Sequence, residues 1–242
     1  MKFAIIAAGE GSRLKSEGIK TDKPLICLQG EPMMHRLMRI FRQEGAEEIV
    51  MIVNEEMPQV AAYAEDMRTT LAQEGCRLTI VVKSTPSSMH SLYEISPYLR
   101  DDRFCLTTVD TIFSETDFSS YMQAFRQDTD GDGCMGVTDY IDDEKPLYVG
   151  TDEEMNITGF YDTADRDCRF ISGGIYGLHP NCLTSLGRCI RTGQHRMRNF
   201  QRQLVADGMR LKAYAFPKIL DIDHATDIAK AETFLQTHPH SS

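Results

Sequence analysis

The 242-residue sequence lacks any apolar run near the roughly 18–20 residues that a membrane-spanning helix needs. The start of the chain, MKFAIIAAGEGS, holds a short apolar stretch, but it has no basic segment before that stretch, and glycines interrupt it. We therefore expect a buried first strand and not a signal peptide. The expected protein is cytoplasmic and has no membrane partner.

Positive charge is scarce. The chain has 26 lysine and arginine residues against 36 aspartate and glutamate residues, which gives a formal net charge of −10. A protein that grips a polyanion usually presents a basic face, so this balance disfavours DNA or RNA as the main ligand. A small anionic ligand is still compatible, because one local pocket can be positive within an acidic protein.

Closely spaced cysteine pairs are also missing. The cysteines form no CxxC motif, and their odd number leaves one unpaired in any intramolecular scheme. We expect reduced thiols in a cytosolic protein, many of them filling the core. The seven are Cys27, Cys76, Cys105, Cys134, Cys168, Cys182 and Cys189.

The chain does contain an alternation of short apolar runs and longer amphipathic stretches, over a length that suits one large α/β domain, residues 1–242. In residues 1–130 this rhythm predicts a mostly parallel, Rossmann-like sheet with helices on both faces. The expected strands are 3–8, 48–53, 78–82 and 104–109, the expected helices are 32–44, 57–74, 88–99 and 117–127, and residues 9–23 are expected to form a long loop.

Residues 131–242 have a different pattern. Turn residues separate their first apolar runs, which predicts antiparallel additions to the sheet that form a lid or a pocket. The expected strands are 134–139, 147–150, 155–161, 170–178, 210–215 and 219–222, and the expected helices are 180–191, 197–206 and 224–236.

The strongest local pattern is the stretch AAGEGSRL after the first apolar run, with KPL downstream. A buried strand would deliver this loop to the carboxyl edge of the sheet, where α/β proteins bind ligands. Glycines allow positive φ and close backbone approach, amides can form an anion-binding nest, and basic side chains neutralise phosphates. We expect a phosphate site made by Ala7, Ala8, Gly9, Gly11, Ser12, Arg13 and Lys23.

Two better-known glycine motifs do not fit this loop. The P-loop pattern G-x-x-x-x-G-K-[ST] is absent, and Leu14 stands where a dinucleotide fingerprint needs its third glycine. An isolated G-x-G pair would favour a plain strand-to-helix connection. Two glycines together with Arg13, Lys23-Pro24 and Gly30-x-Pro32 favour a binding function.

Carboxylates follow two apolar runs at the same predicted edge. Asp110 ends the 104–109 strand, and Asp221 and Asp223 alternate along an extended segment, so both project from one face. Mg²⁺ takes oxygen ligands, often one or two carboxylates with phosphate oxygens and waters. We expect a Mg²⁺ site from Asp110 with Asp221 or Asp223. The alternatives are a turn role for Asp110 and a capping role for Asp223, while Asp227 is expected in the first turn of the last helix.

Hydroxyls and paired glycines mark two further stretches. Ser87, Ser88 and Ser91 open a predicted helix, so their hydroxyls either read the edge of a nucleobase or cap the helix. The paired Gly173 and Gly174 interrupt a β-rich run, which indicates a bulge or the close approach of a ligand.

With these motifs the sequence resembles the sugar nucleotidyltransferase superfamily over nearly its whole length. The stretch 8–14 with Lys23-Pro-Leu25 and Gly30-Glu-Pro32 resembles the family's N-terminal signature, residues 220–227 resemble its late acidic segment, and residues 171–178 resemble its acceptor strand. The resemblance implies a GT-A-like nucleotidyltransferase fold, with the nucleotide on residues 1–130 and the acceptor on residues 131–242.

The resemblance also implies roles for single residues. Arg13 would hold the β- and γ-phosphates, Lys23 would stabilise charge at the α-phosphate, and Asp110 would bind Mg²⁺, so these three are the expected catalytic residues. Gly173, Gly174 and Tyr176 would line the acceptor pocket. Many members place the lysine of a Glu-Lys-Pro motif just before that strand, but here the stretch reads Phe160-Tyr-Asp-Thr163, so that Lys145, Arg166 and Arg169 are the candidate replacements.

The implied reaction transfers a nucleoside monophosphate from a nucleoside triphosphate to a sugar 1-phosphate, giving an NDP-sugar and pyrophosphate. The pattern Ser88-x-x-Ser91-Leu-Tyr93 is similar to phosphocholine-type cytidylyltransferases, which favours CTP or UTP and makes a phosphorylated alcohol the alternative acceptor.

A catalytically silent nucleotide-binding regulator is the alternative from another class, and the retained Lys23 and Asp110 argue against it. A glycosyltransferase is disfavoured because Val109-Asp-Thr-Ile112 lacks a D-x-D motif.

Overall fold

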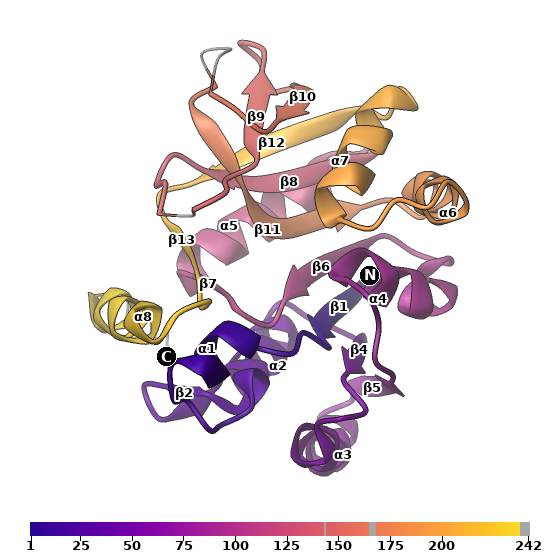
Figure 1. Ribbon diagram of the computed structural model, residues 1–242. Coiled ribbons are helices and arrows are strands. Elements are labelled where there is room, and N and C mark those ends of the chain that lie inside the picture. The colour runs from indigo at the N-terminus through magenta and orange to yellow at the C-terminus, as the bar shows by residue number, and fades with distance from the viewer. Residues whose placement is uncertain (143, 165–167, 238–242) are drawn as a thin grey trace.

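The computed structural model describes residues 1–142, 144–164 and 168–237. Its main feature is a nine-stranded mixed sheet in the order β10-β9-β11-β6-β1-β4-β5, with β8 paired to β11 and β12 paired to β8 (Figure 1). Because β6 pairs with β11, one continuous sheet joins the two halves of the chain. The expected α/β fold with a mixed central sheet is confirmed.

The parallel part of the sheet follows directly from its apolar runs. Along β1, Phe3 and Ile5 face one side, and Ala4 and Ile6 face the other, and all four are buried. A strand buried on both faces has to be covered by helices on both faces, which is the parallel α/β arrangement. The parallel strands are β1 (Lys2–Ala7), β4 (Glu48–Val53), β5 (Arg77–Val82) and β6 (Phe104–Thr108).

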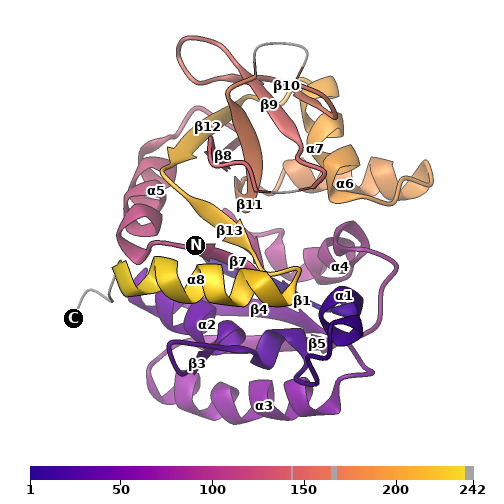
Figure 2. The same cartoon turned by 60° about the vertical axis from the view of Figure 1, so that its left-hand side comes forward.

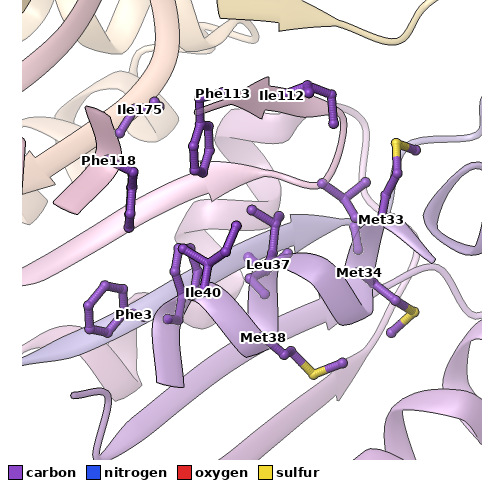
Figure 3. Close-up of a cluster of buried hydrophobic side chains, with 14 of the residues drawn as sticks. Phe3, Met33, Met34, Leu37, Met38, Ile40, Ile112, Phe113, Phe118 and Ile175 are labelled. Carbon is purple, nitrogen blue, oxygen red and sulfur yellow. The ribbon is translucent and has the colours of Figure 1, made fainter. Parts of the chain in front are cut away.

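Helices form a layer on each face of the sheet (Figures 1 and 2). Figure 3 shows part of one core, where Leu37 and Ile40 of α2 lie near Phe113 and Phe118. This face is covered by α2 (Met33–Gln43), α3 (Pro58–Gln73), α5 (Glu115–Gln127) and α8 (Ala225–Thr237). The other face is covered by α4 (Ser88–Ile95), α6 (Cys182–Arg191) and α7 (Met197–Ala206).

The second half adds strands to the β6 edge. The antiparallel pairing expected for the first runs of this half is confirmed for β8, β9, β10 and β11, and β12, for which no direction was expected, runs parallel to β8. The helices α6 and α7 lie between β11 and β12 and return the chain so that β12 starts at the same end as β8. These strands are β8 (Gly133–Thr138), β9 (Tyr148–Thr151), β10 (Ile157–Tyr161), β11 (Phe170–Leu178) and β12 (Leu211–Phe216).

Short elements are where the sequence-based expectations are wrong. The expected loop 9–23 contains the helix α1 (Ser12–Ser16), and a 3-10 turn, η1 (Lys23–Leu25), closes it. The helix expected over 88–99 ends at Ile95, before Pro97, and the 3-10 turn η2 (Ser96–Leu99) follows. Elements of two to five residues are too short to show a hydrophobic period. The unpredicted strands are β2 (Cys27–Leu28), β3 (Glu31–Pro32) and β7 (Thr111–Phe113), the last paired with the predicted β13 (Ile219–Asp221).

Candidate active site

Three segments distant in sequence meet at the carboxyl edge of the parallel strands. The glycine-rich loop leaves β1, and Asp110 lies in the turn between β6 and β7. The short β7–β13 ladder pairs Thr111 with Asp221, and the Ile222 amide donates to the Asp110 carbonyl at 3.2 Å. The ladder therefore fixes the backbones of both acidic segments beside each other.

The glycine loop turns sharply because Gly11 has φ 61°, at the residue that precedes α1. A Cβ atom on Gly11 would also lie 3.2 Å from the Lys23 Cβ. Both the backbone conformation and the available space therefore favour glycine at this position. The positive φ that glycine allows is used at Gly11 and not at Gly9.

Lys23 is the centre of the site. Its Nζ donates to Asp110 Oδ2 at 2.5 Å and to Asp223 Oδ1 at 2.9 Å, and the residue is only 8% exposed. Arg13 Nη1 donates to the other oxygen of Asp223 at 3.0 Å. The four predicted residues Arg13, Lys23, Asp110 and Asp223 are thus joined in one chain of ion pairs. The Lys23 ammonium group holds Asp110, 87 positions away in sequence, and Asp223, 200 positions away.

The charges in this cluster stabilise one another. Burial opposes the positive charge of Lys23, but the carboxylates of Asp110 and Asp223 outweigh it and raise the pKa of Lys23 above its usual range. Burial likewise acts to raise the pKa of Asp110, but the Lys23 ammonium and the Thr108 hydroxyl lower it below the ordinary value. Lys23 is therefore a cation and Asp110 an anion throughout the neutral range.

A polar support that the sequence analysis missed holds the base of the glycine loop. The buried Asn54 follows β4 and donates from Nδ2 to the Ala8 carbonyl at 3.1 Å. Ser84 in turn donates to Asn54 Oδ1 at 2.7 Å. A polar residue directly after a fully buried strand was the only signal for this role.

A pocket of about 600 Å³, here named the glycine-loop pocket, opens over the site. Ala7 is fully buried in the core and does not line it, whereas all the other predicted nucleotide-binding residues do. Its lining residues are Ile6, Ala8, Gly9, Glu10, Gly11, Ser12, Arg13, Leu14, Lys23, Thr85, Pro86, Ser87, Ser88, Ser91, Thr108, Val109, Asp110, Asp221 and Asp223.

The three predicted serines lie at the wall of the glycine-loop pocket formed by α4. Ser87 is the N-cap of α4, and its Oγ accepts from the His90 amide at 3.4 Å, so its capping role is present. The buried Ser91 hydroxyl shares a 2.6 Å hydrogen bond with Thr85. Ser88 lines the same wall.

A second pocket of about 310 Å³, the β13 pocket, shares Arg13, Asp221 and Asp223 with the first. Carboxylates outnumber basic groups in it. Its lining residues are Arg13, Thr138, Tyr140, Asp142, Glu144, Ile171, Ser172, Gly173, Ile219, Leu220, Asp221, Asp223, His224, Thr226, Asp227 and Lys230.

The three predicted acceptor residues lie in different surroundings: a pocket lining, a β-bulge and the buried core. Gly173 lines the β13 pocket. Gly174 has φ 74°, at a register shift between β11 and β8, and a Cβ there would lie 2.9 Å from the Thr111 Oγ1, so the bulge predicted from the paired glycines is present. Tyr176 lies in the buried core and lines neither pocket.

A third concavity, the α7 groove of about 680 Å³, adjoins the β13 pocket through Glu144. It contains Lys145, one of the candidate replacements, whereas Arg169 pairs with Asp139 outside it and Arg166 lies outside the described residues. Two arginines of α7 were not predicted. Arg198 and Arg202 both bind Asp162, at 2.6 and 2.8 Å, and the full lining is Glu144, Lys145, Pro146, Tyr148, Asp162, Thr163, Ala164, Arg196, Arg198, Asn199 and Arg202.

The start of α8 does not use Asp223 as its cap. Asp227, in the first turn as expected, accepts from the Asp223 and His224 amides at 3.2 and 2.8 Å. Glu17 accepts from the Ala225 amide at 2.6 Å. These contacts leave the Asp223 carboxylate directed at Lys23 and Arg13.

The donor set fits a hard divalent cation. Carboxylate oxygens of Asp110 and Asp223 converge on one ammonium nitrogen, so both are directed at a common point where a cation is stabilised. Among the described residues no group of three or more His, Cys, Asp or Glu side chains forms a complete metal cage. Mg²⁺ often takes only one or two carboxylates and completes its shell with phosphate oxygens and water, so this arrangement suits it.

Known proteins share this sequence and architecture. The profile of the MobA-like NTP transferase domain family matches residues 3–207. The chain belongs to this family. It is also 25% identical over 189 residues to an Oryza sativa subsp. japonica protein assigned as a mannose-1-phosphate guanylyltransferase. That match covers 76% of the chain but 51% of the relative, so the chain spans about half the length of the curated relative it matches.

Two solved structures have the same fold. The inositol-1-phosphate CTP transferase from T. maritima superposes with a TM-score of 0.78 at 19% identity, covering 99% of this chain and 98% of that one. A Bacillus anthracis protein assigned as a glucose-1-phosphate thymidylyltransferase, in complex with sucrose, gives a TM-score of 0.83 at 18% identity and covers 100% and 98%. At these identities the likeness establishes the fold of this MobA-like chain.

Across residues 1–142, 144–164 and 168–237, no helix of this NTP transferase domain is both long and apolar enough to cross a membrane.

Proposed function

We propose that this MobA-like domain transfers a nucleoside monophosphate from a nucleoside triphosphate to a phosphorylated acceptor, with a sugar 1-phosphate as the first candidate. The observation that carries the proposal is the convergence of Arg13, Lys23, Asp110 and Asp223 in the lining of the glycine-loop pocket. Two basic side chains and a glycine-rich backbone suit a triphosphate. Ser87, Ser88 and Ser91 suit the base, with CTP or UTP favoured.

The proposed reaction is an in-line displacement. An acceptor phosphate oxygen forms a bond to the α-phosphorus while the bond to the pyrophosphate oxygen breaks, so no covalent enzyme intermediate is required. Lys23 and Arg13 stabilise the charge that develops on the transferring group. Holding both anions in one orientation supplies further acceleration.

Mg²⁺ is part of the proposal. When bound, it would neutralise phosphate charge and orient the leaving pyrophosphate. Asp110, together with Asp221 or Asp223, would hold it. The Lys23 ammonium now lies between Asp110 and Asp223, so in the loaded site we expect it to turn toward the α-phosphate.

The β13 pocket and the α7 groove are the proposed acceptor side. The reacting phosphate would lie where the glycine-loop pocket and the β13 pocket share Arg13, and the rest of the acceptor would extend toward the basic side chains of the α7 groove. Lys145, in the stretch Glu144-Lys-Pro146, lines this groove together with Arg198 and Arg202. In this proposal these three cations take the place of the lysine that many family members carry just before the acceptor strand. Acceptor length is therefore a variable that a substrate panel can test.

One observation favours a second acceptor class. In the β13 pocket the carboxylates of Asp142, Glu144, Asp221, Asp223 and Asp227 outnumber the cations of Arg13 and Lys230. A pocket of this charge suits a phosphorylated alcohol with a cationic end, such as phosphocholine. A sugar 1-phosphate would instead use these oxygens as hydrogen-bond acceptors for hydroxyls.

Pyrophosphate release tests the proposal. Purified protein with Mg²⁺ is offered each common nucleoside triphosphate together with sugar 1-phosphates or phosphocholine. We expect release that needs one nucleotide and one acceptor, and a fall in kcat of about 10²–10³-fold in Asp110→Asn. Asp66→Asn, which removes a carboxylate exposed on α3, is the matched control. Tight nucleotide binding without release for any acceptor would favour a regulator, and near-normal turnover of Asp110→Asn would refute the assigned site.

A further inference from the structure

Glu17 connects the glycine loop to the start of α8. Its Oε1 lies 2.6 Å from His224 Nδ1, and its Oε2 accepts from the Ala225 amide at 2.6 Å. The two partners are 207 and 208 positions away in sequence. Because Ala225 is the first residue of α8, Glu17 satisfies an amide that has no partner within its own helix.

The same residue is rigidly connected to Arg13. Glu17 terminates α1, and its amide donates to the Arg13 carbonyl at 3.1 Å. On the other side, His224 directly follows Asp223 in sequence, and both amides are held by Asp227. Glu17 therefore joins two short units, one carrying Arg13 and the other carrying Asp223.

The ion pair between Arg13 and Asp223 would not by itself hold these units together. Asp223 is 47% exposed and Arg13 is 54% exposed, and ion pairs between side chains this accessible contribute little and adapt easily. The Glu17 contact to Ala225 instead reaches the backbone. It fixes the position of the peptide segment and not only the direction of a side chain.

We propose that Glu17 is a positioning residue, which docks α1 onto the start of α8 and so holds the Asp223 carboxylate against Lys23 and Arg13. This inference rests on the proposed nucleotidyl transfer. If it holds, loss of Glu17 changes the alignment of the reacting phosphates more than the affinity for the nucleotide. The expected kinetic result is a lower kcat with little change in KM for the nucleotide.

Two measurements on the full chain test the role. In the protein without nucleotide, hydrogen exchange across residues 220–228 should become about tenfold faster in Glu17→Ala, because the Ala225 amide loses its acceptor. In turnover, Glu17→Ala should lose about tenfold in kcat while KM for the nucleotide stays within about twofold. Glu17→Gln keeps an oxygen for the Ala225 amide and should fall between Glu17→Ala and the unmodified chain.

Glu55→Ala is the matched control, since Glu55 is an exposed carboxylate elsewhere on the nucleotide half. It should change neither measurement. Unchanged exchange in Glu17→Ala would overturn the docking contact, and faster exchange with unchanged kcat would overturn the positioning role. If the unmodified chain releases no pyrophosphate with any substrate pair, the proposed function fails, whereas the exchange measurement still decides whether Glu17 docks α8.

Discussion

The glycine-loop pocket and the α7 groove both gather basic side chains beside aspartate, but they are built in different ways. In the first, Lys23 is 8% exposed and meets two carboxylates from distant segments. In the second, the side chains of Arg198 and Arg202 are 25% and 34% exposed, come from one helix, and share Asp162. Buried charges have few alternative partners, so the first cluster is fixed by the fold, while the second can exchange Asp162 for a ligand.

Among the changes that test this contrast, removing Lys23 should have the largest effect on kcat and on the melting temperature. We expect Lys23→Met to lower kcat by about 10³-fold or more, because the transferring phosphate loses a charge-stabilising donor. The melting temperature should also fall, since Asp110 and Asp223 lose their shared cation. Pyrophosphate release and thermal unfolding would measure both effects.

Lys20→Met controls for the loss of one exposed lysine in the same segment. It should leave kcat and the melting temperature near those of the unmodified chain. A Lys23→Met protein that retained a tenth of the normal kcat would show that the buried cluster is not the chemical centre.

A change in the α7 groove should have a smaller and different effect. Arg198→Ala removes one charge-assisted donor, so we expect KM for the acceptor to rise about tenfold while KM for the nucleotide is unchanged. Arg191→Ala on the exposed side of α6 is the matched control. Equal rises in both KM values would assign Arg198 to general stability and would remove the distinction between the two sites.

The smallest expected effect is on stability at low pH. Burial acts to raise the pKa of Asp207, but hydrogen bonds from Ser185 and Gln203 and the charge of Arg188 lower it below the ordinary value. A carboxyl with a depressed pKa in the folded state adds stability above its unfolded pKa and loses it as pH falls through the folded value. Between about pH 5 and pH 3 the melting temperature should therefore fall less steeply in Asp207→Asn than in the unmodified chain. Parallel curves would show that Asp207 keeps its ordinary pKa.

Long elements were predictable from the sequence because their apolar residues form recognisable patterns. The four parallel strands are continuous apolar runs, and α2 repeats apolar residues at helical spacing. The expected and observed bounds of these elements and of α3 agree within one or two residues. The helix α1 and the strand β7 have no period to detect, and contacts made elsewhere in the chain stabilise them. The direction of β12 depends on how α6 and α7 return the chain, which local pattern does not encode.

The site was predictable at positions where phosphate or metal chemistry allows only a few residue types. Arg13, Lys23, Asp110 and Asp223 were named from the motif, and the structure brings them together, although their roles in binding and catalysis are still predictions. Tyr176 was named from the same kind of pattern and lies in the core. Asn54, Glu17, Arg198 and Arg202 were missed because their roles depend on neighbours that only the folded chain supplies.

The distance along the chain between Lys23 and Asp223 has a consequence for synthesis. As the protein leaves the ribosome, β1 and β4 can pair early, but β6 has no β11 partner until residue 178 has emerged. Asp223 emerges later still, so a nascent chain that ends before it cannot complete the charged cluster. The charged cluster is then among the last parts of the described chain to form, so under the proposed function an unfinished chain lacks its reactive centre.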